Sequence, residues 1–217
     1  MKKTSFIFIV TLLFASQVVA QEGAWNITQG TGLDGKSYTG TLKITKIGNA
    51  HDLLWETSIG GGKGISILQN DKLFAGFGSD QFGYGVVVYD IKADGTLEGT
   101  WAGNNMNGTT GTEKITSKNA KDLNGTYTIE GTYPSKKIYT GTITIKKTGS
   151  TYKCEWTVGT ANYKGVGIVD GKKLAIGYGT TGDVYGLVIY SFTKDKATGI
   201  WSFANATNTG VENIEKK

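Results

Sequence analysis

Eight aromatic side chains are the residues of this sequence best suited to binding a small molecule. Each offers a flat ring for stacking and a polar O–H or N–H group at its edge, and each falls on the apolar face of a predicted strand. Inside a small β-barrel such residues could line a ligand cavity, or they could simply fill the core. Both interpretations stay open at the level of sequence. The eight residues are Tyr38, Trp55, Tyr89, Trp101, Tyr139, Trp156, Tyr190 and Trp201.

Few residues are suited to catalysis or to metal binding. His51 is the single histidine and is matched by Tyr152 in the repeat described below, so no histidine-based triad or multi-histidine metal site recurs in the chain. Glu113 and Glu212 are the clearest acids at equivalent positions, but two lone glutamates are not the paired carboxylates of a glycosidase. We interpret each as a strand-end hydrogen-bond acceptor or a surface charge. The sequence therefore predicts no catalytic residues, no metal and no cofactor.

Two glycine-rich segments resemble nucleotide-binding motifs only superficially. The segment 60–64, Gly-Gly-Gly-Lys-Gly, lacks the Ser or Thr and the following helix of a phosphate loop, so we predict a hairpin turn. The Gly-x-Gly segments at 76–78 and 83–85 are flanked by strands, without the helix of a dinucleotide site. Such glycines more often allow a bend or leave room for a bulky neighbour. The chain also contains no arginine, which argues against phosphate recognition.

These residues belong to a duplicated unit. The segment 38–44, Tyr-Thr-Gly-Thr-Leu-Lys-Ile, returns as Tyr-Thr-Gly-Thr-Ile-Thr-Ile at 139–145, an offset of 101 positions that also matches Trp55 with Trp156 and Tyr89 with Tyr190. Near the end the offset shortens slightly. A period of this length indicates a duplicated folding unit and not a short solenoid repeat.

Alternating apolar and polar residues predict strands throughout both copies. Residues 38–46 place Leu42 and Ile44 on one face and threonine and lysine on the other, and residues 139–146 repeat the pattern. A period of two with a polar outer face indicates a half-buried strand. Further strands follow at short intervals between Gly, Asn and Asp turn signals, and no segment has a helical period. We predict an antiparallel meander of seven or eight strands in each copy, closed as a barrel or folded as a sandwich.

One strand of each copy is apolar on both faces. It carries Val86 and Val88 in the first copy and Leu187 and Ile189 in the second, on the side opposite the aromatic residues. Such a strand requires cover on both sides. We expect this face to pack against the other repeat or against a second chain.

The first 20 residues have the pattern of a cleaved signal peptide. A basic start, a short apolar stretch and a small-residue site before Gln21 predict export to the periplasm or the exterior of the cell. Removing Lys2 and Lys3 from the 23 basic residues leaves 21 against 18 acidic ones, a net charge of about +3. That charge is too small and too scattered for a nucleic-acid partner. No later segment reaches the length of about 20 apolar residues that a membrane span needs.

The single cysteine is Cys154, which cannot form an internal disulfide. It occupies the position of Leu53 in the first copy. We therefore predict a small buried apolar side chain, with a reactive thiol as the alternative.

The recurring pattern of glycines and aromatic residues resembles a known repeat. Each copy reads Tyr-Thr-Gly-Thr-x-x-Ile, a strand with Trp, Leu-x-x-Gly-x-Gly, Tyr-Gly-x-Val-x-Tyr, Gly-x-Trp and a closing Glu. This is similar to a repeat of exported bacterial proteins often labelled fibronectin-binding, and more loosely to avidin-type and lipocalin-type barrels. The first resemblance implies adhesion to a host or matrix protein.

The sequence thus predicts an exported, non-enzymatic, all-β binding protein. Its units are a signal peptide at 1–20 and β repeats at 21–120 and 121–217. Adhesion to an extracellular protein is the first functional hypothesis, and a carrier of a small apolar or aromatic ligand is the alternative. An enzyme of unknown type is a third hypothesis, which the comparison of the two copies does not support.

Overall fold

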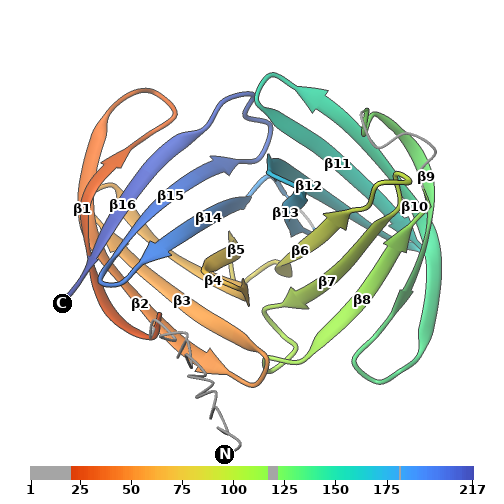
Figure 1. Cartoon of the computed structure of the whole chain (residues 1–217), viewed down its shortest axis with the longest axis horizontal. Coiled ribbons are helices and arrows are strands. Elements are labelled where there is room, and N and C mark those ends of the chain that lie inside the picture. Colours follow the sequence, from red (N-terminus) through yellow and green to blue (C-terminus); the bar gives the residue numbers. More distant parts are fainter. Residues whose placement is uncertain (1–20, 117–121, 181) are drawn as a thin grey trace, which may run out of the picture.

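The computed structural model describes residues 21–116, 122–180 and 182–217, and in these ranges the protein is all-β without a helix. This confirms the predicted fold class. Sixteen strands, all paired antiparallel, form two closed barrels of eight strands each (Figure 1). In the described part of the chain there is consequently no helix of the length and apolarity needed to cross a membrane. The predicted signal peptide lies outside the described residues.

Barrel 1 combines the two ends of the chain. Its strands are β1 (Gly23–Thr31), β2 (Ser37–Ile47), β3 (Ala50–Thr57), β4 (Gly60–Gln69), β5 (Lys72–Gly78), β14 (Tyr185–Thr193), β15 (Lys196–Phe203) and β16 (Gly210–Lys216). It closes where β1 pairs with β16 and where β5 pairs with β14.

Barrel 2 is one continuous stretch of chain. Its strands are β6 (Tyr84–Ile91), β7 (Leu97–Gly103), β8 (Thr110–Ile115), β9 (Gly125–Thr132), β10 (Ile138–Thr148), β11 (Thr151–Val158), β12 (Ala161–Asp170) and β13 (Lys173–Gly179). It closes where β13 pairs with β6. Barrel 2 is therefore inserted into barrel 1 between β5 and β14.

The barrels do not coincide with the sequence repeats. The predicted boundary at residues 120 and 121 falls between β8 and β9, inside barrel 2, so each barrel contains strands of both copies. The reason is that β5 and β6, although consecutive, belong to different barrels. Each copy contributes five strands to one barrel and three to the other.

The chain passes between the barrels at two equivalent places. A Cβ atom on Gly76 would lie 1.9 Å from the carbonyl oxygen of Gly85, and one on Gly177 would lie 2.0 Å from that of Gly186. No other residue type can stand where two backbones approach so closely. The two connecting segments also pair, since Thr180 N–H donates to the Gly83 carbonyl at 2.9 Å.

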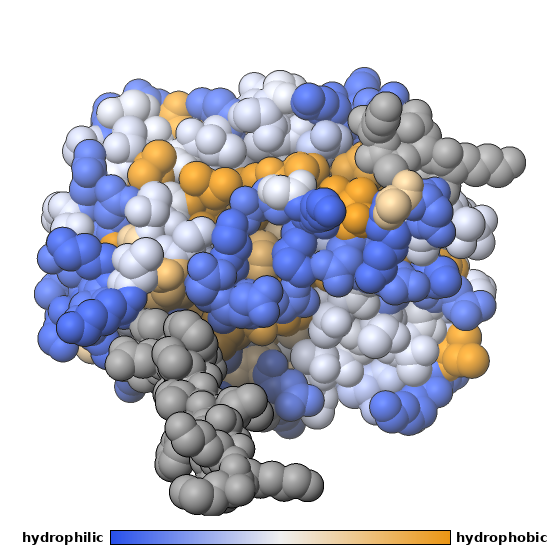
Figure 2. All heavy atoms as spheres, viewed as in Figure 1, coloured by the Kyte–Doolittle hydropathy of each residue, from blue (hydrophilic) through white to orange (hydrophobic). Residues whose placement is uncertain are grey.

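The barrels are held together by a shared apolar cluster. Val86 and Val88 of β6 and Leu187 and Ile189 of β14 are all buried in it, together with residues of β4, β5, β12 and β13. The face for which we expected cover is therefore covered by the neighbouring barrel of the same chain. In the view of Figure 2, hydrophilic residues form most of the outer surface and apolar residues show mainly in a band set back between them.

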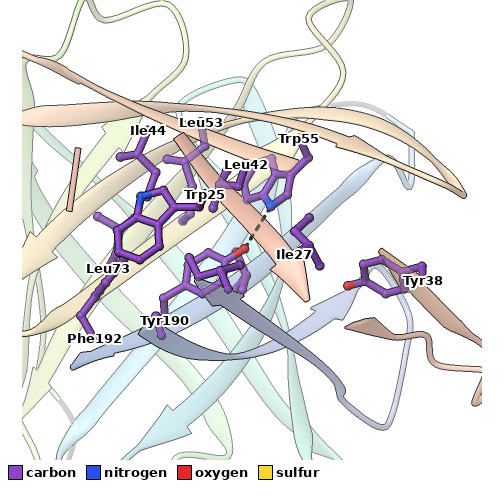
Figure 3. Close-up of a cluster of buried hydrophobic side chains, with 14 residues drawn as sticks. Trp25, Ile27, Tyr38, Leu42, Ile44, Leu53, Trp55, Leu73, Tyr190 and Phe192 are labelled. Carbon is purple, nitrogen blue, oxygen red and sulfur yellow. Dashed lines mark hydrogen bonds between the residues drawn. The ribbon is translucent and has the colours of Figure 1, made fainter. Parts of the chain in front are cut away.

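Each barrel has its own interior core, as the alternation of the strands predicts. Trp25, Leu42 and Ile44 lie inside barrel 1, where Trp25 meets Phe192 edge to face (Figure 3). Cys154 lies fully buried inside barrel 2, which confirms its prediction as a small apolar core residue. Burial raises the pKa of its thiol.

Candidate functional site

A buried carboxylate lies inside barrel 1. Glu212 of β16 is only 5% exposed and accepts three hydrogen bonds. Tyr38 of β2 donates its hydroxyl to Oε2 at 2.8 Å, and Trp55 of β3 donates its indole N–H to Oε1 at 3.1 Å. Tyr190 of β14 donates its hydroxyl to the same Oε1. We call these four residues the barrel 1 cluster; Figure 3 shows Trp55 and Tyr190 pointing toward each other within it.

Barrel 2 repeats this arrangement. Glu113 of β8 is 7% exposed, and its Oε2 accepts from the Tyr139 hydroxyl of β10 at 2.8 Å. Its Oε1 accepts from the Trp156 indole N–H of β11 at 3.1 Å and from the Tyr89 hydroxyl of β6. These four residues are the barrel 2 cluster.

Burial and charge fix the phenols of both clusters as donors. Burial first, and then the negative charge of the neighbouring glutamate, raise the pKa of Tyr38, Tyr139, Tyr89 and Tyr190 well above the usual range. Each hydroxyl therefore keeps its proton at any physiological pH. Burial also raises the pKa of the Glu113 carboxyl, although the three donors oppose that effect.

Glycines on adjacent strands make room for these rings. A Cβ atom on Gly30 would lie 2.3 Å from the Tyr38 ring, and one on Gly131 would lie 2.1 Å from the Tyr139 ring. Gly64, Gly99, Gly111, Gly165, Gly199 and Gly210 stand in the same way beside the other six aromatic residues identified in the sequence. The recurring glycines thus serve the packing of the aromatic residues, as expected, and the phosphate-loop resemblance has no structural counterpart.

Each cluster draws on both sequence copies. Tyr38 and Trp55 come from the first copy, whereas Tyr190 and Glu212 come from the second. The sequence identified the tyrosines and tryptophans but treated the glutamates as strand-end or surface groups, and the surface interpretation is wrong. A signal was present: Glu113 shares the inward side of β8 with Ile115, and Glu212 shares that of β16 with Ile214.

A cavity of about 230 Å³ lies next to the barrel 1 cluster. Its walls include Tyr38, Trp55, Tyr190, Trp201 and Glu212, so four of the eight aromatic residues identified in the sequence, two from each copy, line one space. The rim includes the β3–β4 turn. There Ile59 is 67% exposed, and Gly60, Gly61 and Gly62 begin β4 instead of forming the predicted turn.

The corresponding cavity of barrel 2 is smaller, about 80 Å³. Trp101, Tyr139, Trp156 and Glu113 line it, whereas Tyr89 is fully buried behind the cavity wall. Additional rings account for the smaller size: Tyr163 occupies the position that Gly62 has in barrel 1. Tyr133 and Tyr178 complete an aromatic enclosure.

The two cavities offer few kinds of chemical group. Among the described residues there is no group of three or more His, Cys, Asp or Glu side chains that could hold a metal ion. His51, buried in β3, is separate from both cavities. What each cavity offers is ring surface, one carboxylate and the donors that orient it.

Comparison of the chain with protein-family models, with curated proteins and with solved structures finds no match.

Proposed function

We propose that this protein binds small molecules inside its two barrels. The observation that supports the proposal most strongly is the carboxylate–phenol–indole cluster, which occurs in both barrels although each is assembled from strands of both copies. A buried glutamate is a costly way to fill a core, because an ionised group loses its hydration. An apolar cavity with a few convergent polar groups and a carboxyl of raised pKa is the usual form of a binding site.

The clusters inside the barrels favour binding there over adhesion through the outer faces. The outward faces of the strands carry the solvated threonines and lysines of any exposed sheet. We further propose that the protein acts after export, because the first 20 residues have the sequence of a cleaved signal.

The size of the barrel 1 cavity sets the first test. An apolar cavity of about 150 Å³ is known to hold benzene, so the cavity of about 230 Å³ should hold toluene or indole. A ligand present at about 100 times its Kd stabilises the folded protein by about 2.7 kcal/mol. For a chain of this length that corresponds to a rise in Tm of roughly 5–10 °C. Thermal denaturation followed by circular dichroism measures it.

A variant that fills the cavity provides the control. A Cβ atom on Gly62 would meet only Trp55 Cε3, at 4.0 Å, and the equivalent position in barrel 2 already carries Tyr163. Gly62→Tyr should therefore fold and lose the response to toluene and indole. Glu56→Tyr, on the exposed outer face of β3, should keep it. No response from the unmodified protein to either compound, up to its solubility limit, would contradict the proposal.

A further inference from the structure

The barrel 1 cavity carries a single formal charge, and it is negative. Glu212 is the only acidic side chain in its lining, which contains no basic side chain. The three hydrogen-bond partners of Glu212 all donate to it. Both oxygens of the Glu212 side chain thus take part in hydrogen bonds from neutral donors. In residues 21–116, 122–180 and 182–217, no lysine forms an ion pair with Glu212 or with Glu113. Glu212 is thus hydrogen-bonded but has no positively charged partner.

The carboxylate has room for another donor. A carboxylate offers about four acceptor positions, and the barrel 1 cluster fills three of them. An additional hydrogen bond from a positively charged donor would be stronger than one from a neutral donor. It would also supply the missing countercharge.

The walls suit a cation for an independent reason. The rings of Tyr38, Trp55 and Trp201 surround the cavity with Phe77, and the faces of aromatic rings attract positive charge. Such attraction strengthens when the groups are shielded from water, and both Trp55 and Glu212 are buried. Anionic ligands are disfavoured, because the lining contains no lysine and the chain contains no arginine.

We propose that barrel 1 binds an organic ammonium ion with an apolar part about the size of a benzene ring. The ammonium group pairs with Glu212, and the apolar part lies between the rings of the cavity wall. This inference rests on the proposed function and assigns the class of ligand to one of its two sites. Barrel 2 shares the carboxylate but not the space, because Tyr163 and Tyr133, which have no aromatic counterpart in the lining of barrel 1, reduce its cavity to about 80 Å³.

Comparing two ligands of similar shape separates the effect of ligand charge on affinity from the effect of ligand size. Benzylammonium and benzyl alcohol differ mainly in the positive charge, and isothermal titration calorimetry at neutral pH measures the affinity of each for the full chain. We expect benzylammonium to bind at least tenfold more tightly than benzyl alcohol. We expect benzoate, of the same size and opposite charge, to give no measurable binding.

Variants of the protein then show which residue causes the preference for benzylammonium. Glu212→Gln keeps the shape of the side chain and removes its charge, so it should abolish the preference for benzylammonium. Glu56→Gln removes a charge from the outer face of β3, next to Trp55 in sequence, and should keep the preference. Gly62→Tyr should weaken the binding of both ligands at least tenfold.

Each outcome decides the inference. Equal affinities for benzylammonium and benzyl alcohol would overturn the ammonium assignment and leave small-molecule binding in place. A preference that survives Glu212→Gln would also overturn it, because the cation would then bind elsewhere. If neither ligand binds, the assignment fails, and the response to toluene and indole decides separately whether the proposed function fails with it. If Glu212→Gln does not fold, the affinities of the unmodified protein for benzylammonium and benzyl alcohol still test the assignment.

Discussion

Barrel 1 is closed by the first and last strands of the chain, and a disulfide can test that closure. Asn26 of β1 and Glu215 of β16 are direct partners on the outer face of the barrel. Directly paired residues of antiparallel strands have Cα atoms about 4.5–5.5 Å apart, which lies within the range that a disulfide spans. Asn26→Cys combined with Glu215→Cys should therefore form a bridge under mild oxidation.

The bridge should stabilise the protein strongly. It would close a loop of roughly 190 residues, for which the loss of chain entropy in the unfolded state corresponds to about 5 kcal/mol as an upper value. At 2–4 °C per kcal/mol, the Tm should rise by up to roughly 10–20 °C. Mass spectrometry and electrophoresis without reductant detect the bridge, and thermal denaturation with and without reductant measures its effect. Cys154 is fully buried inside barrel 2 and should not exchange with it.

The control distinguishes the two possible ways of closing a barrel. Because Glu212 matches Glu113, residue 215 matches Thr116 in the first copy. If each repeat closed its own barrel, Asn26→Cys would cross-link with Thr116→Cys. A bridge between residues 26 and 116, with the pair at 26 and 215 left reduced, would refute the closure of barrel 1 by β1 and β16.

Four further predictions follow from the same contacts. A fragment of residues 83–180 contains all strands of barrel 2 and should unfold cooperatively in urea, less stably than the full chain because the cluster between the barrels is exposed; a disordered fragment would contradict the inserted topology. Because the folded state raises the pKa of the Glu113 carboxyl, it holds that proton more tightly than the unfolded state does. Stability should therefore fall as pH rises from about 4.5 through the raised pKa, and Glu113→Gln should lack this fall in urea denaturation series; parallel curves would disprove it. Cys154 should react with a thiol reagent only after denaturation, since it is buried and its thiol pKa is raised, and rapid labelling of native protein would count against the packing. Val88→Asp with Ile189→Asp should cost more than about 4 kcal/mol and unfold the chain, and a folded protein with separated repeats would contradict the pairing of β5 with β14 and β6 with β13.

The strands and their faces could be predicted because alternation is a local property. Leu42 and Ile44 point inward with Tyr38, and the two-sided strands carrying Val88 and Ile189 lie where two apolar surfaces meet. Each of these assignments needs only the sequence of one strand and its period of two.

The partnering of strands could not be predicted in the same way. Because the two copies match, β5 can pair with β6 of its own copy or with β14 of the other, and local sequence does not distinguish these choices. The choice is made by contacts distant in sequence, such as those that bury Val88 and Ile189 in the one apolar cluster between the barrels. The role of Glu212 could not be predicted for a similar reason, because its three hydrogen-bond partners lie 22 to 174 positions away in the sequence.

The most direct test of a binding site inside barrel 1 is a crystal structure of the full chain with benzylammonium. We predict the ring between Tyr38, Trp55 and Trp201, with the ammonium nitrogen about 2.7–3.2 Å from a carboxylate oxygen of Glu212. Benzylammonium bound on the outer surface, with the interior of barrel 1 unoccupied, would contradict the account.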